Sequence, residues 1–449
     1  MRKPYRAGEA RLPRLQPGGV GRKRRRVRSR LMKLGCIADD FTGATDLANN
    51  LVRGGMRVVQ TIGIPGTALQ ASVDAVVVAL KTRTVSADEA VRESLAALRW
   101  LQAQGAEQIY FKYCSTFDST PEGNIGPVIE ALMKAMGTGF TIATPAFPDN
   151  KRTVFKGHLF VGNVLLNESG MQNHPLTPMT DANLVRVLQA QCRGKVGLID
   201  HKVVAKGPAA IRECIASLEE DGVSIAIVDA VANDDLLSLG PALKDMPLVT
   251  GGSGVALGLP WNFGIQASTA ASRLPAAVGL QAVISGSCSS ATNEQVRNFI
   301  AAGGHALAID ALQVASKNDV AAQAIEWAAP LLRSGPVLIY SSADPDTVKA
   351  VQTRLGADQA GALVERALAS IAQGLVNLGV RQLLVAGGET SGACVQSLGV
   401  AQMQIGPQID PGVPWCHATL PSGQGLHLAL KSGNFGTPDF FDKSFALLR

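Results

Sequence analysis

Two adjacent aspartates, Asp39 and Asp40, follow the strand-like run Leu34–Ala38, and a glycine-containing turn into a helix comes directly after them. Strand alternation sends the two carboxylates in different directions. We therefore expect one to accept a proton from a substrate hydroxyl and the other to bind hydroxyl groups. The alternative is that one of them caps the helix. A cap needs one acid and the segment offers three, with Asp46 the third, so we predict catalytic carboxylates with Thr42 beside them as a substrate contact.

Cations and hydroxyl side chains follow the next strand-like runs. In open α/β sheets, ligands bind at the carboxyl ends of the strands. Such a mix suits a small polyhydroxy acid, because Arg and Lys bind its carboxylate while Asp, Asn and Thr bind its hydroxyls. Each cation alone is more often an exposed surface residue, and the shared location strengthens the set. We predict substrate contacts from Lys81, Arg83, Lys112, Asp118, Ser119 and Thr120, with the run Asp149–Arg152 in the same group.

Two turns rich in glycine or serine, Ser285–Ser290 and Gly387–Gly392, follow strand-like runs in the second half, and a third, Lys431–Gly436, lies in the tail. Small residues let backbone N–H groups approach an anion, and the positive end of a following helix favours it. The first two turns precede helices and predict a cradle for nucleotide phosphates, and the third is a candidate for closing over the nucleotide. The alternative is that these turns are tight only because strand-to-helix connections need small residues.

A fourth turn, Gly251–Gly254, resembles a dinucleotide-binding fingerprint and would favour an NAD(P)-dependent dehydrogenase. Its spacing departs from G-x-G-x-x-G, and residues 266–280 lack the acid expected to bind the ribose. The sequence contains no phosphate-binding G-x-x-x-x-G-K-[ST] motif. The six histidines show no zinc spacing, with His158 kept as a minor substrate contact. The dehydrogenase is therefore the less favoured alternative, and metal ligands stay unassigned.

Strand-length apolar runs alternate with stretches of helical periodicity from Met32 onward. This alternation predicts parallel sheets covered by helices on both faces. The predicted strands are Leu34–Ala38, Val58–Ile62, Ala75–Leu80, Gln108–Phe111, Thr141–Ala143, Ser224–Val228, Leu248–Thr250, Ala282–Ile284, Ala306–Ile309, Val337–Tyr340 and Gln382–Val385. The predicted helices are Ala44–Arg53, Ala87–Gln104, Ile125–Met136, Ala182–Gln191, Pro208–Asp221, Ala291–Ala302, Val320–Leu332 and Gly361–Leu378.

The stretch Ile265–Gly279 is rich in Ala and Ser without strong periodicity, which indicates a linker. We therefore predict an α/β fold of two domains, each a mostly parallel sheet flanked by helices, with the active site in the cleft between them. The predicted segments are a basic arm at residues 1–31, a first domain at 32–264, the linker at 265–280 and a second domain at 281–449. We expect the glycine-rich tail of the second domain to be irregular.

The formal net charge of +6 averages two unlike parts. Residues 1–31 hold twelve basic residues and one acid, a charge of +11, whereas the other 418 residues hold 30 basic and 35 acidic residues, a charge of −5. Binding to nucleic-acid phosphates needs cations clustered on the folded body, so only an arm-mediated nucleic-acid interaction stays as an alternative. The Arg, Gly and Pro content predicts a disordered arm. We expect the arm to be an upstream-start or cloning extension, with Met32 as the native start.

Seven dispersed cysteines without a C-x-x-C pair argue against a disulfide framework and for a reducing compartment. No apolar run approaches the roughly 18 residues that a membrane span needs. The arm also lacks the apolar stretch of a secretory signal. We expect a cytoplasmic protein, with a homodimer as the default assembly.

Five segments together resemble the four-carbon acid sugar kinases: Ile37–Asp46, Lys112–Pro127, Ser285–Ser289, Gly387–Gly392 and Lys431–Gly436. The resemblance covers the chain from about Met32 onward and is strongest to the members that act on 3-oxo-tetronates. It implies a sugar-acid-binding first domain and an ATP-binding second domain. It also implies phosphorylation of the 4-hydroxyl of 3-dehydro-L-erythronate or 3-dehydro-D-erythronate. Kinases of related tetronates, such as threonate or erythronate, are the near alternative.

Carried over position by position, the resemblance implies ATP contacts at Ser287, Gly387, Gly388, Glu389, Thr390 and Gly433. Phosphoryl transfer depends mostly on positioning and on charge neutralisation, and Mg²⁺ is expected with ATP. Asp40 or Asp39 is then the expected acceptor of the hydroxyl proton.

Overall fold

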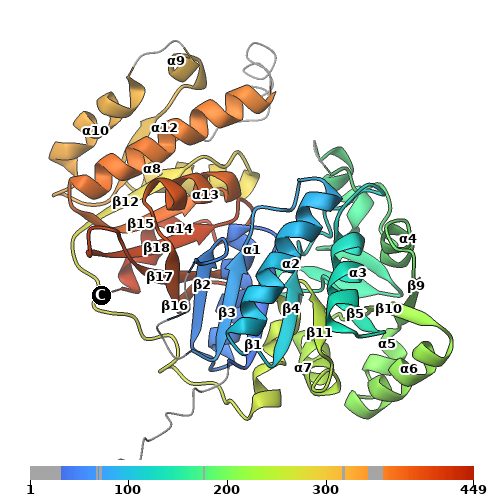
Figure 1. The fold of residues 1–449 in the computed structure, drawn as a ribbon. Coiled ribbons are helices and arrows are strands. Elements are labelled where there is room, and N and C mark those ends of the chain that lie inside the picture. Colours follow the sequence, from blue (N-terminus) through green and yellow to red (C-terminus); the bar gives the residue numbers. More distant parts are fainter. Residues whose placement is uncertain are drawn as a thin grey trace, which may run out of the picture. The chain divides into compact units, whose positions relative to one another are not determined.

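The computed structural model of the chain describes residues 32–66, 69, 73–174, 177–315, 319–341 and 357–448. The basic arm, residues 1–31, lies outside the described residues. Within the described part, a fifteen-stranded sheet and a separate three-stranded sheet are flanked by helices (Figure 1). The predicted α/β class is confirmed.

In the first half of the chain the strands pair in parallel, in the order β2-β3-β1-β4-β11-β5-β10-β9. Their bounds are β1 Leu34–Ala38, β2 Val58–Ile62, β3 Ala75–Ala79, β4 Gln108–Lys112, β5 Thr141–Thr144, β9 Lys195–Ile199, β10 Val223–Val228 and β11 Leu248–Gly251. The small antiparallel sheet consists of β6 Arg152–Phe155, β7 His158–Val161 and β8 Val164–Leu165.

The helices of this half are α1 Phe41–Arg53, α2 Ala87–Ala103, α3 Ile125–Met136, α4 Leu184–Gln189, α5 His201–Val204, α6 Pro208–Glu220 and α7 Asn233–Ala242. Short 3-10 helices lie at η1 Pro148–Asn150, η2 Leu166–Glu168, η3 Met171–Asn173, η4 Gly254–Leu257 and η5 Pro260–Phe263. Most predicted boundaries are right within one or two residues. The prediction missed α5, α7, β9 and the small sheet.

In the second half, parallel strands run in the order β13-β14-β12-β15-β18, and β17 and β16 continue the sheet antiparallel. The strands are β12 Leu280–Ser285, β13 His305–Ala308, β14 Val337–Tyr340, β15 Val380–Ala386, β16 Gln402–Asp410, β17 Val413–Thr419 and β18 Gly425–Lys431. The helices are α8 Ser290–Ala301, α9 Ala311–Ala315, α10 Val320–Leu331, α12 Ala357–Asn377, α13 Gly388–Ser397 and α14 Phe440–Ala446.

The glycine-rich tail was wrongly predicted to be irregular, since it forms β16, β17, β18 and α14. Gly and Pro inside strands normally argue against a strand. Here Gly406 and Pro407 lie where the β16–β17 register shifts, between Ile405 and Gln408. The tail also joins the two halves, because β16 pairs antiparallel with β2. One continuous sheet therefore replaces the two separate sheets that we predicted.

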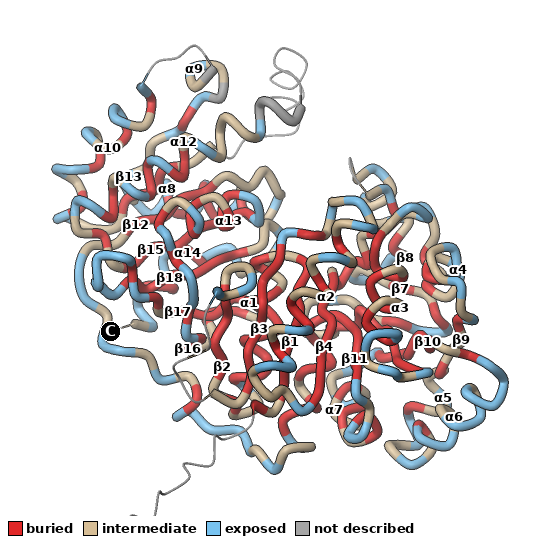
Figure 2. Tube along the Cα trace, in the orientation of Figure 1, coloured by how far each residue is buried: buried red, intermediate tan, exposed pale blue. Residues whose placement is uncertain are grey.

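The central strands are buried on both faces. Every residue of β1, β3 and β4 is buried, which requires cover on each side of the sheet. Figure 2 shows this burial along the strands, with exposed backbone on outer helices such as α6 and α10. Loops at the ends of such strands start from a rigid base.

Strand register brings the candidate loops together. Ala38 pairs with Ala79 and with Lys112, and Lys112 pairs with Gly251, so the loops after β1, β3, β4 and β11 share one edge. In the second half, β12 and β18 both flank β15, with Ser285 opposite Ala386 and Ala386 opposite Lys431. The three glycine- or serine-rich turns therefore also start side by side.

Candidate active site

Arg83 binds both acids of the pair that follows β1. Its guanidinium donates to the two oxygens of Asp39 at 2.9 Å each and to Oδ1 of Asp40 at 2.7 Å. The backbone prepares this contact, because Thr82 N donates to Asp39 O at 2.9 Å and brings the loop after β3 against β1. A cation that we predicted to bind substrate therefore already has two carboxylate partners.

Asp40 also begins α1. Its Oδ1 accepts a hydrogen bond from Gly43 N and its Oδ2 one from Thr42 Oγ1, both at 2.9 Å, so the capping alternative describes Asp40. Burial raises the pKa of Asp40, but Arg83, Lys112 and the two hydrogen bonds outweigh burial and hold that pKa below its usual value. Asp40 is therefore an ionised carboxylate at neutral pH.

A cavity of about 370 Å³ opens beside this cap. Its wall includes hydroxyl side chains from the loops of the first half. A lining of this kind fits a small anion that carries several hydroxyl groups. The charged lining residues are Arg83, Lys112, Arg152, Asp40, Asp46 and Asp118. Three lining residues, Ser432, Asn434 and Phe435, come from the turn after β18.

Lys112 and Arg152 are the cavity cations that have no carboxylate partner among the described residues. Lys112, at the end of β4, is 2% exposed, and its Nζ donates to Tyr113 O at 2.8 Å. Arg152 begins β6, and its Nη1 donates to Asn150 O while its buried Nε has no partner. Burial lowers the pKa of Arg152. Carboxylates of the cavity act on both cations at longer range, but none forms a salt bridge with them, and buried cations without a salt-bridge partner favour an anionic ligand.

Of the three residues predicted in this loop to bind substrate hydroxyls, one lines the cavity and two lie outside its lining. Asp118 lines the cavity, and its buried Oδ1 has no hydrogen-bond partner. Ser119 and Thr120 lie outside the lining. Nε2 of Gln191 donates to Ser119 Oγ and to Thr120 O at 2.8 Å each, which fixes this loop.

Asp46 is a cavity residue to which our sequence analysis assigned no role beyond the acidic cluster. Ser253 Oγ donates to its Oδ2, and its buried Oδ1 has no partner. Burial raises the pKa of Asp46 to about 6. Its partner lies 207 positions further along the chain, so no local pattern could reveal the contact.

Backbone atoms of the segment after β5 pack directly against the glycines of the turn Gly251–Gly254. A Cβ at Gly252 would lie 2.8 Å from Pro145 O, and one at Gly254 would lie 2.2 Å from Ala146 O. The glycines therefore allow close packing against the segment after β5. This use of the turn does not favour a dinucleotide-binding role.

The three turns of the second half form one cradle, comprising Ser285–Ser290, Gly387–Gly392 and Lys431–Gly436. Gly387 N donates to Lys431 O at 2.8 Å, and Ser289 Oγ donates to Gly433 O at 2.5 Å. A Cβ at Gly433 would lie 2.5 Å from Ser287 Oγ. The N-termini of α8 and α13 both open on this cradle, which gives it the backbone donors that suit phosphate.

Two family models match the chain: the sugar-binding N-terminal domain over residues 34–259 and the nucleotide-binding C-terminal domain over residues 282–441. A 3-oxo-tetronate kinase of Burkholderia multivorans is 60% identical over 419 residues, which is 92% of this chain and 97% of that protein. One of Pseudomonas fluorescens is 59% identical over 421 residues, with the same coverage of both chains. The chain belongs to the 3-oxo-tetronate kinase family.

Solved structures agree with this membership. A Salmonella typhimurium LT2 protein, described provisionally as a tRNA synthase, is 45% identical with a TM-score of 0.82 over 92% of this chain and 98% of that one. A Haemophilus influenzae protein is 44% identical with a TM-score of 0.75 over 92% of this chain and 100% of that one. The fold described here is therefore shared by solved structures of proteins 44% and 45% identical to this chain.

The cavity and the cradle fall in segments matched by different family models. Most of the cavity lies in the segment matched by the sugar-binding model, and the cradle lies in the segment matched by the nucleotide-binding model. The predicted linker at 265–280 falls between the two matches, while the boundaries themselves stay predictions. The residues for which we predicted ATP contacts all belong to the cradle: Ser287, Gly387, Gly388, Glu389, Thr390 and Gly433.

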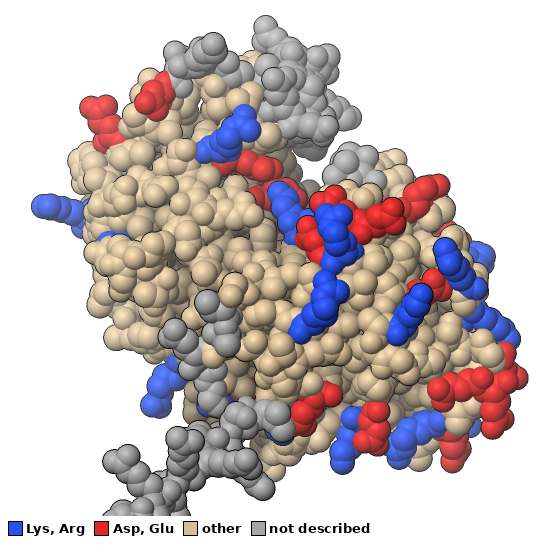
Figure 3. All heavy atoms as spheres, viewed as in Figure 1, with Lys and Arg blue, Asp and Glu red and all other residues tan. Residues whose placement is uncertain are grey.

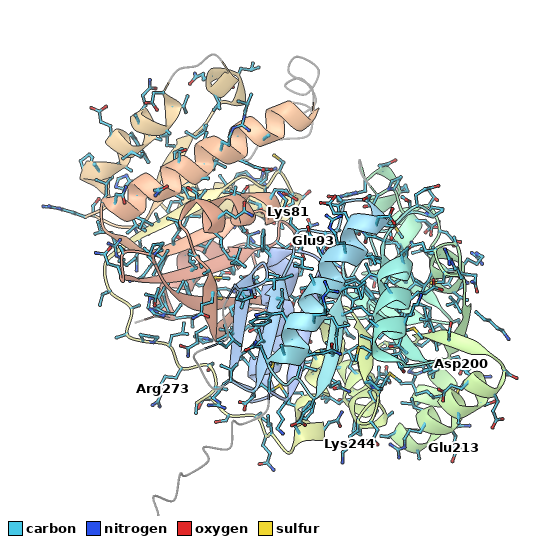
Figure 4. The ribbon with its side chains drawn as sticks, in the orientation of Figure 1. Lys81, Glu93, Asp200, Glu213, Lys244 and Arg273 are labelled. Atoms are coloured by element: carbon cyan, nitrogen blue, oxygen red, sulfur yellow. The ribbon has the colours of Figure 1, made fainter. Side chains whose placement is uncertain are left out.

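Lys81 lies with the nucleotide-binding segment of this kinase and not in the cavity lining. Its Nζ is 2.6 Å from Glu389 Oε2, and Figure 4 shows it at the end of β3 nearest the second half. The hydrogen bond that Lys81 donates to the Glu389 carboxylate raises the pKa of Lys81. A Cβ at Gly388 would lie 3.8 Å from Thr42 Oγ1. The N-termini of α1 and α13 therefore approach each other beside this ion pair.

Other expected features can be compared with the described residues. Lys/Arg and Asp/Glu are interspersed on the face drawn in Figure 3. All seven cysteines are free. None of the described helices is long and apolar enough to cross a membrane. The described residues contain no group of three or more His, Cys, Asp or Glu placed to hold a metal ion.

Proposed function

We propose that this protein transfers the γ-phosphoryl group of ATP to the 4-hydroxyl of a 3-oxo-tetronate, in the catabolism of four-carbon acid sugars. The expected substrates are 3-dehydro-L-erythronate and 3-dehydro-D-erythronate. One observation carries the proposal: a charged cavity of the sugar-binding segment is also lined by Ser432, Asn434 and Phe435 of the nucleotide-binding segment. A kinase must bring acceptor and nucleotide together away from water. The proposed active site is therefore the cleft between the two domains.

The sugar acid binds in the cavity. Lys112 and Arg152 bind its carboxylate, because they are the cavity cations without a carboxylate partner in the described part of the chain. Thr42 and Asp118 bind its hydroxyl groups. Arg83 also lines the cavity and stays a proposed substrate contact that in addition holds Asp39 and Asp40 in place. For Ser119 and Thr120, which Gln191 holds outside the lining, the predicted contact to substrate stays a proposal. Lys81 acts on the phosphate side, where it already contacts Glu389.

ATP binds on the cradle through Ser287, Gly387, Gly388, Glu389, Thr390 and Gly433. The close packing supports this assignment, since a Cβ at Gly433 would lie 2.5 Å from Ser287 Oγ and one at Gly387 would lie 3.0 Å from Thr390 Oγ1, so the glycines let the turns that carry the helix N-termini approach one another. Backbone N–H groups at the two helix N-termini face the phosphates. Mg²⁺ bound with the nucleotide neutralises phosphate charge. Its ligands are not assigned.

In the proposed reaction the C4 oxygen forms a bond to the γ-phosphorus as the bond to the ADP oxygen breaks. The hydroxyl proton passes to a carboxylate, for which Asp40 or Asp39 is the candidate. Asp40 is the more accessible of the two, because its side chain is 21% exposed and that of Asp39 is 6% exposed. Asp40→Asn and Asp39→Asn test the role. If each variant retains most of kcat, neither carboxylate is the proton acceptor.

A coupled ADP-release assay tests the function as a whole. The panel contains both 3-dehydro-erythronates, threonate and erythronate. We expect the highest kcat/KM with a 3-dehydro-erythronate. A higher kcat/KM with threonate or erythronate would overturn the substrate assignment, and absence of ADP release with every acid would overturn the kinase assignment.

We also propose a cytoplasmic homodimer in which residues 1–31 are dispensable and no nucleic acid or membrane takes part. Deleting residues 1–31 should leave thermal unfolding, kcat and the oligomeric state in solution unchanged. Loss of the fold or of phosphoryl transfer on deletion would show that the arm belongs to the enzyme.

A further inference from the structure

Lys431, the last residue of β18, is a buried cation in the cradle. Its side chain has 0% relative exposure. Nζ lies within hydrogen-bonding distance of Thr292 Oγ1 at 2.9 Å, Ser432 O at 3.2 Å, Gly433 O at 3.0 Å and Phe435 O at 3.1 Å. An ammonium group has three N–H donors, so four oxygens share them. The turn that follows Lys431 therefore wraps around the Lys431 ammonium group, which hydrogen-bonds to its carbonyl oxygens.

This ammonium has no carboxylate partner among the described residues. Burial, with no opposing charge, lowers the pKa of Lys431 to about 7. None of the charged or titratable side chains on the surrounding elements hydrogen-bonds to its Nζ: Asp46 on α1, Glu294 and Arg297 on α8, Arg381 on β15, Glu389 on α13, His417 on β17 and His427 on β18. An unpaired desolvated cation is costly for a protein. A nearby anionic ligand would offset that cost.

The turn that Lys431 organises faces both proposed ligands. Gly433 O accepts hydrogen bonds from Ser289 and Thr292 at 2.5 and 2.8 Å inside the cradle. Ser432 and Asn434 line the sugar-acid cavity. The conformation of one turn therefore sets the geometry on the nucleotide side and on the acceptor side.

We propose that Lys431 is a positioning residue whose ammonium holds this turn in its binding form, and that the nucleotide phosphates supply the counter-charge that the ammonium lacks. The inference rests on the proposed function, since it takes the bound anion to be a nucleotide. A neutral amine has only two N–H donors, so loss of the proton weakens the turn. Nucleotide binding therefore takes up a proton from the buffer wherever Lys431 of the free protein is partly neutral.

Isothermal titration of Mg²⁺ and a non-hydrolysable ATP analogue into the full chain measures this uptake directly. Titrations at one pH in buffers of different ionisation enthalpy give the number of protons exchanged. Because binding raises the pKa of Lys431 from about 7, uptake should be near zero at about pH 5.5 and approach one proton near pH 8. Over the same range the Kd should rise by up to about tenfold per pH unit.

Two variants separate this role from simple packing. Lys431→Arg keeps a permanent cation, so it should retain much of the nucleotide affinity while losing the extra proton uptake. Lys431→Met should raise the KM values of both ATP and sugar acid, whereas Lys134→Met, on the exposed face of α3, should change neither.

The wild-type measurement decides the matter even if Lys431→Met fails to fold. Proton uptake at about pH 8 that is equal in wild type and Lys431→Arg would overturn the inference. If the wild-type protein binds the analogue but takes up no more protons than Lys431→Arg, only the proposed role of Lys431 is refuted. If it binds no nucleotide at any pH, the proposed function is overturned as well.

Discussion

Replacing Arg152 with Met should weaken sugar-acid binding without unfolding the protein. Arg152 lines the cavity, its buried Nε has no partner, and it forms no ion pair with a described residue. Met retains an apolar, unbranched stem and removes the charge. Since no carboxylate loses a salt bridge, the free energy of unfolding should fall by less than about 1 kcal/mol.

The expected effect on binding follows from the contact that is lost. A hydrogen bond to a charged group contributes about 1.5 to 3 kcal/mol, which corresponds to about 10-fold to 150-fold in affinity. The substrate carboxylate does not change during transfer to the 4-hydroxyl, so Arg152 binds the ground state and the transition state alike. The KM for the sugar acid should therefore rise by this factor while kcat stays near the wild-type value.

Steady-state ADP release at saturating ATP, with the sugar acid varied, measures both constants. Lys151, which the sequence analysis grouped with Arg152, is exposed and lies outside the cavity lining. Lys151→Met is therefore the matched control and should behave as wild type. Arg152→Lys keeps the charge but loses the planar two-pronged donor, so its KM should lie between the two. An unchanged KM in a folded Arg152→Met variant would refute the role of Arg152 in binding the carboxylate.

Three further substitutions test the remaining charges. Arg83→Met should lower the free energy of unfolding by about 3 kcal/mol, because Asp39 and Asp40 lose their shared counter-ion. Urea unfolding measures this loss, and adding Asp39→Asn should recover part of the lost stability. No recovery in the double variant would show that the pairing is unimportant. Burial raises the pKa of Asp46 from 3.8 to about 6, so its ionisation destabilises the folded state increasingly as pH rises through that window. Asp46→Asn should therefore become more stable than wild type from about pH 4 upward, with the difference reaching about 3 kcal/mol above pH 6. Thermal unfolding of both proteins across this range measures the difference in stability, and a difference that does not vary with pH would contradict the prediction. Lys81→Met should raise the KM for ATP and leave that for the sugar acid unchanged, with less than about 1 kcal/mol lost in stability because the ion pair is exposed; a higher KM for the sugar acid alone would instead favour a substrate contact.

The fold was predictable where local pattern and final environment agree. Continuous apolar runs such as Ala75–Ala79 occur in central parallel strands because both faces are covered. The tail was not predictable in the same way. Gly406 and Pro407 lower the strand signal locally, while the neighbouring strands β17 and β2 supply the hydrogen bonds that make β16 a strand. Only the tertiary structure contains that information.

The candidate site shows the same division. That loops carrying Asp39, Lys112 and the cradle turns should meet at sheet edges follows from strand ends alone. The strand ends do not reveal which cation is available to a ligand, because that depends on contacts across the sheet. Arg83 and Arg152 look alike in the sequence, yet Arg83 forms salt bridges with two aspartates, whereas Arg152 forms none with a described residue and feels Asp118 and Asp46 only at longer range.

The distribution of buried charge explains how a folded body with a formal charge of −5 can serve two anionic ligands. Exposed charge is screened over about a Debye length, so its sign matters little inside a closed cavity. What matters is the local balance after internal pairing. Arg83 is compensated by Asp39 and Asp40, whereas Lys112 and Arg152 beside the cavity and Lys431 beneath the cradle form no ion pair with a described residue. Each proposed anion site therefore contains a cation without a salt bridge, although Asp46 and Asp118 line the cavity as well, and these local charges matter more for ligand binding than the acidic surface does.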